Sequence, residues 1–226
     1  MNIPVLTIDG PSGAGKGTVS RAVSRKLGWH YLDSGSIYRA LAIAVLKQGL
    51  NLNDVAAIVE LAGHIQLQFI CEDDGLKVDL NGEDISAQLG MESTGNTASI
   101  IAAYPEVRAV LLQKQKDFKR APGLVADGRD MGTVVFPDAE FKVFLTASAE
   151  ERAKRRYKQL IEKGIDANLC QITSEIEARD RRDRERATAP LRPAEDAVCI
   201  DSSDLTIEQV IAQVMDFIRQ SGSKTE

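Results

Sequence analysis

A glycine-rich stretch near the N-terminus has the residue types needed to bind phosphate. It consists of Gly10, Pro11, Ser12, Gly13, Ala14, Gly15, Lys16, Gly17 and Thr18. Glycines let successive backbone N–H groups curl around an anion, and the N-terminus of a following helix adds partial positive charge. Lys16 would then reach the β- and γ-phosphates of a nucleoside triphosphate. The stretch therefore predicts a phosphate-binding loop, or P-loop.

The loop also bears on how a magnesium ion would be held. Gly17 occupies the position where many P-loops carry a Ser or Thr that binds Mg²⁺, and Thr18 comes one residue later. We expect the Thr18 hydroxyl to contact phosphate instead, and Mg²⁺ to be held largely by nucleotide oxygens and water. No direct protein ligand is assigned, and Asp127 is the candidate partner of the ion through a water molecule. The Gly-Lys-Gly-Thr ending resembles the loop of adenylate kinase and its relatives more than that of GTPases or motor ATPases.

A charged stretch toward the C-terminus is the second candidate for chemistry. Arg179, Asp183 and Arg186 stand at helical offsets 0, 4 and 7, which predicts that all three lie on one face of a helix. One face of a helix can serve one pocket. From Glu150 to Arg186 the acidic residues are nearly as numerous as the basic ones, so the segment is not a purely basic nucleic-acid stripe.

The elements around these residues alternate between strands and helices. Apolar runs predict buried strands at residues 4–9, 29–32, 123–127, 141–145 and 197–201. Helical patterns begin at Lys16 and at about Ile37, and capping boxes at Ser148–Glu151 and Thr206–Gln209 open two more helices. We therefore predict an α/β, P-loop three-layer fold in which helices flank a central parallel sheet.

One segment departs from this alternation. Between about His64 and Ser86, apolar and polar residues follow each other with the period of strands. Asp74-Gly75 and Asn81-Gly82 supply turn residues, because glycine accepts the positive φ that tight hairpins require. The segment predicts a small antiparallel β insertion.

Composition limits the classes of function. The chain has 226 residues, of which 43% are apolar and 27% charged, enough for one α/β domain. A net charge of -5 argues against a general binder of nucleic acid or membrane surfaces. The three cysteines form no CxxC pair, which indicates neither a disulfide framework nor a zinc site. Without a signal-peptide pattern or an apolar run of membrane-spanning length, we expect a cytoplasmic monomer that acts on small ligands.

Two further motifs give the sequence a specific family resemblance. Residues 32–39 read Leu-Asp-Ser-Gly-Ser-Ile-Tyr-Arg, and residues 126–132 read Ala-Asp-Gly-Arg-Asp-Met-Gly. Together with the β insertion, the pair Ser99 and Arg108, and the arginine-rich run, they resemble signatures of bacterial cytidylate kinases. The resemblance covers nearly the whole chain and implies ATP, with Mg²⁺, as the phosphoryl donor.

The resemblance assigns roles to residues at matching positions. Arg39, Arg129 and Arg186 would grip the acceptor phosphate, and Ser34 would lie beside that nucleotide. Forked guanidiniums can bind a dianionic phosphate and hold it in line for attack. The expected catalytic set consists of Lys16, Arg129 and Arg186.

The same resemblance gives the positions that read the base and ribose. Asp130, Arg108 and Ser99 would contact the base, and Arg179 and Asp183 the ribose. A carboxylate with an arginine complements cytosine, whose N4 donates while N3 and O2 accept, whereas uracil presents a carbonyl at position 4. CMP and dCMP are the expected acceptors, and UMP should be poorer.

The resemblance also suggests how the chain is divided. A single kinase domain would have its core at residues 1–33, 104–150 and 187–220. The region that binds the nucleoside monophosphate (NMP), with its β insertion, would span about 34–103. A lid and arginine-rich region would span about 151–186. The loop from Lys163 to about Leu169 resembles a short lid over ATP, and Arg152, Arg155 and Arg156 stay open as its arginines.

Two other functions remain open on the sequence alone. A P-loop kinase for UMP, AMP or shikimate would share the loop but need different acceptor contacts. A GTP-binding switch would need an Asn/Thr-Lys-x-Asp motif that reads guanine. The near match, residues 76–79, begins with Leu and falls in the predicted hairpin.

Overall fold

The computed structural model describes residues 3–72, 75–162 and 164–222. The chain divides into two compact units, of which the first is Met1–Asp33 with Lys116–Glu226 and the second is Ser34–Gln115. The first unit contains the P-loop, and the second contains the β insertion. The finer division into core, NMP-binding region and lid stays a prediction.

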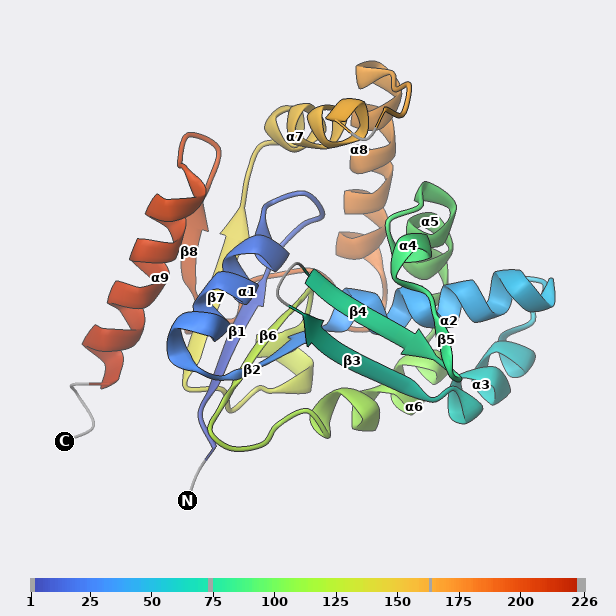
Figure 1. Ribbon diagram of the computed structural model, residues 1–226, viewed down its shortest axis with the longest axis horizontal. Helices are drawn as coiled ribbons and strands as arrows, with labels where there is room; N and C mark the ends of the chain where they lie inside the picture. Colours follow the sequence, from blue (N-terminus) through green and yellow to red (C-terminus); the bar gives the residue numbers. More distant parts are fainter. Residues whose placement is uncertain (1–2, 73–74, 163, 223–226) are drawn as a thin grey trace. The chain divides into compact units, whose positions relative to one another are not determined.

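A five-stranded parallel sheet forms the centre of the first unit (Figure 1). In spatial order its strands are β2 (His30–Asp33), β6 (Leu124–Gly128), β1 (Val5–Asp9), β7 (Phe141–Thr146) and β8 (Val198–Asp201). The register pairs Asp9 with Gly128 and Asp33 with Asp127. Because the carboxyl ends of parallel strands meet at one edge, the ends of β1, β2 and β6 come together there.

Helices α1 (Lys16–Leu27) and α9 (Ile207–Gly222) flank this sheet. The first unit also contains α7 (Ala149–Glu162) and α8 (Leu169–Glu185), which pack on each other, and a short π-helical turn, η1 (Met131–Val135). Helices α1 and α9 pack on each other and on the sheet, where Leu6, Ile8 and Val143 join Val210 and Val214 in the core. The predicted fold class, a central parallel sheet with flanking helices, is confirmed.

The helix ends follow local sequence rules, with one exception. Gly28 ends α1 in the left-handed conformation at φ 66°. At α9, Thr206 and Gln209 form the predicted reciprocal capping box. At α7 only half of the box forms, because the Ser148 backbone N–H donates to Ser203 Oγ instead of to Glu151.

Among the described residues, the helices include none that is long and apolar enough to cross a membrane.

The second unit combines helices with the small antiparallel sheet. Its elements are α2 (Ser34–Gln48), α3 (Val55–His64), β3 (Leu67–Glu72), β4 (Gly75–Leu80), β5 (Glu83–Asp84), α4 (Ser86–Leu89), α5 (Glu92–Ile101) and α6 (Pro105–Lys116), the last of which ends one residue beyond the unit. The strands lie in the order β3-β4-β5. Asn81 and Gly82, at φ 54° and 86°, turn the chain between β4 and β5 as predicted. Asp74 of the other predicted turn lies outside the described residues.

Candidate functional site

The P-loop leaves the central strand β1 in a conformation that requires glycine. Gly10, Gly13 and Gly15 have φ values of 151°, 80° and 90°. A Cβ atom on Gly10 would lie 1.9 Å from the carbonyl oxygen of Leu145 in β7. Gly15 caps α1 without a side-chain hydrogen bond. The first N–H groups of α1 are therefore presented at the loop without a capping side chain, which suits an anion.

Lys16 is buried at the start of α1. Its side chain turns back into the loop, where Nζ donates to the carbonyl oxygen of Pro11 at 2.9 Å. Burial, and next the positive charge of Arg129, lower the pKa of Lys16 to about 7, against the opposing charge of Asp127. A phosphate group placed here would reverse this effect, because its negative charge favours the ammonium form.

Asp127, near the end of β6, is the structure's best candidate for contact with a hydrated metal ion. The carboxylate accepts a hydrogen bond from the Tyr31 hydroxyl at 2.6 Å. Burial and the neighbouring charge of Asp33 raise its pKa to about 7. Two carboxylates that oppose each other's ionisation are stabilised by a cation. The residues therefore fit a hydrated Mg²⁺, although the described part of the chain contains no ready cluster of three or more metal-ligating side chains.

Asp9, the last residue of β1, binds the backbone of the segment that follows β6. Its two carboxylate oxygens accept hydrogen bonds from the backbone N–H groups of Met131 and Gly132, each at 2.8 Å. Burial raises its pKa to about 6, although these two hydrogen bonds act in the opposite direction. This contact fixes the backbone immediately after Arg129 and Asp130. Sequence reasoning missed it, and the one available signal was a charged residue closing an apolar strand.

Four of the residues expected to bind CMP are joined in ion pairs within the first unit. Arg129 Nε donates to Asp183 at 2.7 Å, and Arg186 Nη2 donates to Asp130 at 3.3 Å. The side chains of Arg186 and Asp130 are each 4% exposed. Burial raises the pKa of Asp183, but the charges of Arg129 and Arg179 outweigh it and hold this pKa below its ordinary value.

The arginine-rich helix α8 ends at Glu185, and Arg186 is its C-cap residue. Arg179 and Asp183 lie one turn apart in α8, as expected. Arg186 follows the last helical residue, with extended backbone at ψ 137°, and its Nε donates to the carbonyl oxygen of Ala189 at 2.6 Å. The backbone N–H of Arg186 still donates to the carbonyl oxygen of Arg182 at 3.2 Å, so the chain leaves the helical path only after this residue. That the three side chains share one helical face stays a prediction.

The remaining expected acceptor residues lie in the second unit. Ser34 begins α2 and donates to Gln115 Oε1 at 2.7 Å, while Arg39 donates to the carbonyl oxygen of Leu89. Ser99 is buried in α5. Arg108 is buried in α6, with its guanidinium 5.6 Å from the centre of the Tyr38 ring and a hydrogen bond to the Ala102 carbonyl oxygen at 3.3 Å.

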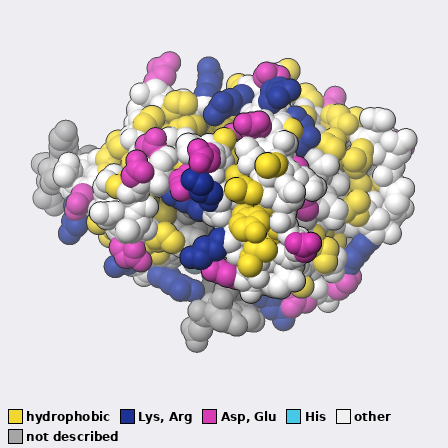
Figure 2. Space-filling model, turned by 90° about the horizontal axis from the view of Figure 1, so that it is seen from above, with side chains coloured by type: hydrophobic (Ala, Val, Ile, Leu, Met, Phe, Trp, Pro, Cys, Tyr) yellow, Lys and Arg dark blue, Asp and Glu magenta, His cyan; other side chains and the backbone are white. Residues whose placement is uncertain are grey.

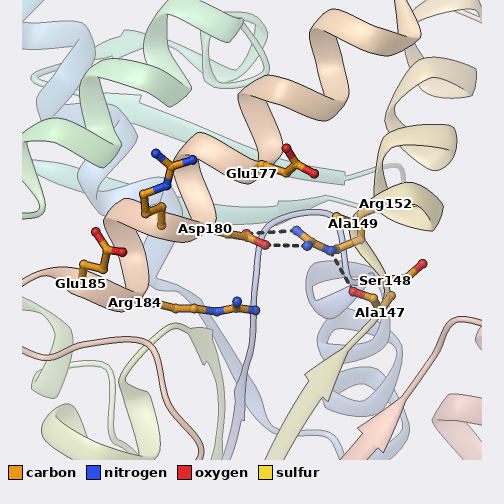
Figure 3. A pocket seen from close by; sticks show the side chains of 9 residues that line it. Ala147, Ser148, Ala149, Arg152, Glu177, Asp180, Arg184 and Glu185 are labelled. Carbon is orange, nitrogen blue, oxygen red and sulfur yellow. Dashed lines mark hydrogen bonds and ion pairs between the residues drawn. The ribbon is translucent and has the colours of Figure 1, made fainter.

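The candidate lid arginines take different positions on α7. Arg155 donates to the Ser202 hydroxyl and carbonyl oxygens. Arg152 is buried and forms a two-pronged ion pair with Asp180 of α8, beside a cavity of about 430 Å³ (Figure 3). Residues 164–168 connect the two helices, and Lys163 lies outside the described residues. Sequence reasoning did not foresee the Arg152–Asp180 pair, which no local pattern marks.

Acidic and basic side chains are mixed on the surface of the protein. On the face shown in Figure 2, Lys and Arg side chains are interspersed with Asp and Glu. On α7, the exposed pair Glu150 and Lys154 lies 2.8 Å apart at helical spacing. Residues 76–79, the near match to a guanine-reading motif, lie within strand β4 of the small sheet.

Comparisons with known proteins identify the family of this chain. The sequence model of the cytidylate kinase family matches residues 6–220. A cytidylate kinase of Photobacterium profundum is 58% identical over 96% of each chain. One of Methylococcus capsulatus is 61% identical over 92% of this chain and 94% of its own.

Solved structures give a weaker likeness. A gluconokinase from Sinorhizobium meliloti aligns with a TM-score of 0.49 at 12% identity, covering 99% of this chain and 95% of that one. That level of likeness does not bear on the substrate. The sequence relatives, matched over almost the full length, are decisive: the chain belongs to the cytidylate kinase family.

Proposed function

We propose that this protein transfers the γ-phosphoryl group of ATP to CMP and dCMP, giving ADP and the corresponding diphosphates. Family membership supports the reaction, and the chemistry of the residues supports the route. Both nucleotides would be held end to end, and the acceptor phosphate would attack in line. The enzyme would act as a cytoplasmic monomer, with neither nucleic acid nor a membrane as a partner.

One electrostatic observation carries the proposal. Lys16, the P-loop lysine, lies close enough to Arg129 and Arg179 for both charges to lower its pKa. Asp127 and Asp183 offset these charges in part, yet the net effect on Lys16 still favours its neutral form, which anionic ligands would reverse. Donor phosphates on the loop and an acceptor phosphate on the arginines would supply those anions together.

On the donor side, the P-loop and Lys16 would bind the β- and γ-phosphates. Residues Gly10 to Thr18 would surround them with backbone N–H groups, the Lys16 ammonium group and the Thr18 hydroxyl. Asp127 would hold the hydrated Mg²⁺ that accompanies ATP, and the ion would supply charge neutralisation on the phosphate oxygens. Lys16 would exchange the Pro11 carbonyl oxygen for phosphate oxygens on binding.

On the acceptor side, Arg39, Arg129 and Arg186 would bind the phosphate of CMP. Asp183 and Asp130 already orient two of these guanidiniums through ion pairs. Orientation before binding lowers the entropy cost of reaching the reactive geometry. Because the acceptor phosphate is ionised near neutral pH, the transfer needs neither a dedicated general base nor a covalent enzyme intermediate.

The remaining acceptor contacts would select the nucleoside. Asp130 with Arg108 and Ser99 would read cytosine, because a carboxylate accepts from N4–H₂ and repels the carbonyl oxygen of uracil. Arg179 and Asp183 would approach the ribose, whose 2′-hydroxyl is optional, and Ser34 would lie beside the nucleotide. The 3% exposure of Asp130 supports base reading, since an accessible water would otherwise weaken discrimination.

The acceptor specificity gives the direct test. ADP formation is measured with Mg-ATP and CMP, dCMP, UMP, AMP or no acceptor, each over a range of concentrations. We expect high kcat/KM for CMP and dCMP, a lower value for UMP, and only background with AMP. Preference for AMP or UMP would leave the kinase reaction but overturn the assignment of the base-reading residues.

A further inference from the structure

The guanidinium of Arg152 joins three segments of the first unit. Nε donates to the carbonyl oxygen of Ala147 at the end of β7, at 3.0 Å. Nη1 donates to the carbonyl oxygen of Ser12 in the P-loop at 2.9 Å. Nη1 and Nη2 also donate to the two carboxylate oxygens of Asp180 in α8, at 3.0 and 2.5 Å. One side chain therefore connects the P-loop, the sheet and α8.

Burial makes this connection costly as a stabilising device. The side chains of Arg152 and Asp180 are 3% and 9% exposed. Removing two opposite charges from water costs about as much as their attraction returns, and apolar replacements of such pairs are often neutral or stabilising. The value of the pair must therefore be sought in the geometry that it imposes.

The pair lies where apolar packing between α7 and α8 gives way. The hydrophobic contacts between these helices involve Ala153 with Ile172 and Ile176, in the first half of α8. Farther along α8, Glu177, Asp180 and Arg184 instead line the cavity of about 430 Å³ beside the start of α7 (Figure 3). An ion pair at this point fixes a part of α8 that apolar contacts leave less constrained.

The fixed part of α8 carries two of the candidate acceptor residues, Arg179 and Asp183. Asp180 follows Arg179 directly and precedes Asp183, which in turn holds Arg129 at 2.7 Å. At the other end of the connection, a Cβ on Gly13 would lie 3.1 Å from Arg152 Cβ, so α7 packs directly on the P-loop. Hydrogen bonds thus run from Ser12 through Arg152 to Asp180, and α8 connects Asp180 to Asp183 and its partner Arg129.

We propose that Arg152 is a positioning residue for phosphoryl transfer. Through Ser12 and Asp180 it sets the placement of the donor-phosphate loop relative to the helix that carries Arg179 and Asp183. This inference rests on the proposed function, because it assigns donor phosphate to the loop and acceptor contacts to α8. It also gives Arg152 a role through protein groups, in place of direct contact with ATP as a lid arginine.

The discriminating variant removes the hydrogen bonds while keeping the interior filled. In Arg152→Met/Asp180→Leu, both charges are replaced by apolar side chains, so the melting temperature should stay near that of the wild-type protein. We expect kcat with saturating Mg-ATP and CMP to fall about tenfold to a hundredfold, while each KM changes by less than about threefold. The matched control is Glu150→Leu/Lys154→Met, which removes the exposed pair of the same helix and should leave kcat unchanged.

A conservative single variant keeps the test independent of folding. Arg152→Lys retains the charge opposite Asp180 but cannot reproduce the fork to three partners, so its kcat should lie between wild type and the double variant. A wild-type kcat in the folded double variant would overturn the positioning role, and so would a wild-type kcat in Arg152→Lys. Absence of CMP-dependent ADP formation in the wild-type protein would instead overturn the proposed function, and with it this inference.

Discussion

The Lys16 ammonium nitrogen donates to the carbonyl oxygen of Pro11 at 2.9 Å, so the lysine bonds to its own loop. A carbonyl group offers only a partial negative charge, whereas triphosphate oxygens carry full charges. The buried lysine, with its pKa lowered to about 7 by burial and by Arg129, is therefore poised to gain both a better partner and a proton when ATP binds.

Proton uptake on ATP binding follows from this relationship. At pH 8 Lys16 is mostly neutral before binding, and the phosphates should raise its pKa enough to take up a large part of about one proton per ATP. Calorimetric titration in two buffers of different ionisation enthalpy gives the number of protons directly. Lys16→Met should abolish the uptake, and equal uptake by the variant and the wild type would contradict the assignment.

The pH dependence of stability should show the burial of Asp127. Burial and the Asp33 charge raise its pKa from 3.8 to about 7. Between these values the folded protein binds more protons than the unfolded chain, so the contribution of Asp127 to stability falls as pH rises. The free energy of unfolding of Asp127→Asn, measured relative to wild type, should therefore rise by on the order of 2 kcal/mol as the pH is raised from 5 to 8.

Urea unfolding at pH 5, 6, 7 and 8 measures this gain as the difference between the two proteins. Asp9, whose pKa burial raises to about 6, contributes a similar fall below that pH in both proteins and cancels from the difference. Lys16 acts in the opposite sense above about pH 7, where the unfolded chain binds more protons. A difference that is independent of pH would show that Asp127 is not buried as described.

Base selection should depend on the carboxylate of Asp130. Asp130→Asn can donate as well as accept, so the preference for CMP over UMP in kcat/KM should shrink by about fivefold to a hundredfold. The KM for ATP should change far less. The exposed residue Asp138 provides the control Asp138→Asn, which should leave the preference intact. Unchanged discrimination in Asp130→Asn would remove Asp130 from base reading.

The tight exit from β1 predicts an asymmetry between two glycines. Gly10→Ala would force a methyl group against the Leu145 carbonyl oxygen at a positive φ, so it should cost about 3 kcal/mol or more. In Gly63→Ala, in helix α3, the new methyl group would meet nothing within 4 Å beyond its chain neighbours and the backbone of its own helix, so the variant should gain about 0.5–1 kcal/mol. Melting curves of the two variants test the pair, and similar melting temperatures would contradict it.

The sequence predicts the parts of this fold that local rules determine. Each strand of the parallel sheet is marked by a short apolar run, and the P-loop by its glycines and lysine. The antiparallel insertion follows from alternation and from Asn81-Gly82. The sequence does not mark helices α3 to α6 as clearly, because neither a glycine loop nor a capping box precedes them; Asp54 alone caps α3.

Long-range polar contacts are what the sequence does not predict. Asp9 binds backbone groups of Met131 and Gly132, and Arg152 pairs with Asp180; neither pair has a spacing that marks it. The end of α8 is likewise not marked by periodicity, since the helical spacing is regular through Arg186, which is the C-cap residue. Such contacts depend on how strands and helices are arranged, which periodicity along one segment cannot specify.

Transfer of a labelled phosphoryl group tests the central claim most directly. The protein is incubated with CMP, magnesium and ATP labelled at the γ-phosphate, and the products are separated. We predict that the label appears in the β-phosphate of CDP, with ADP formed in equal amount, and that Lys16→Met slows this transfer about 10²-fold to 10³-fold. Label found in inorganic phosphate, or in no product that contains cytidine, would contradict the account.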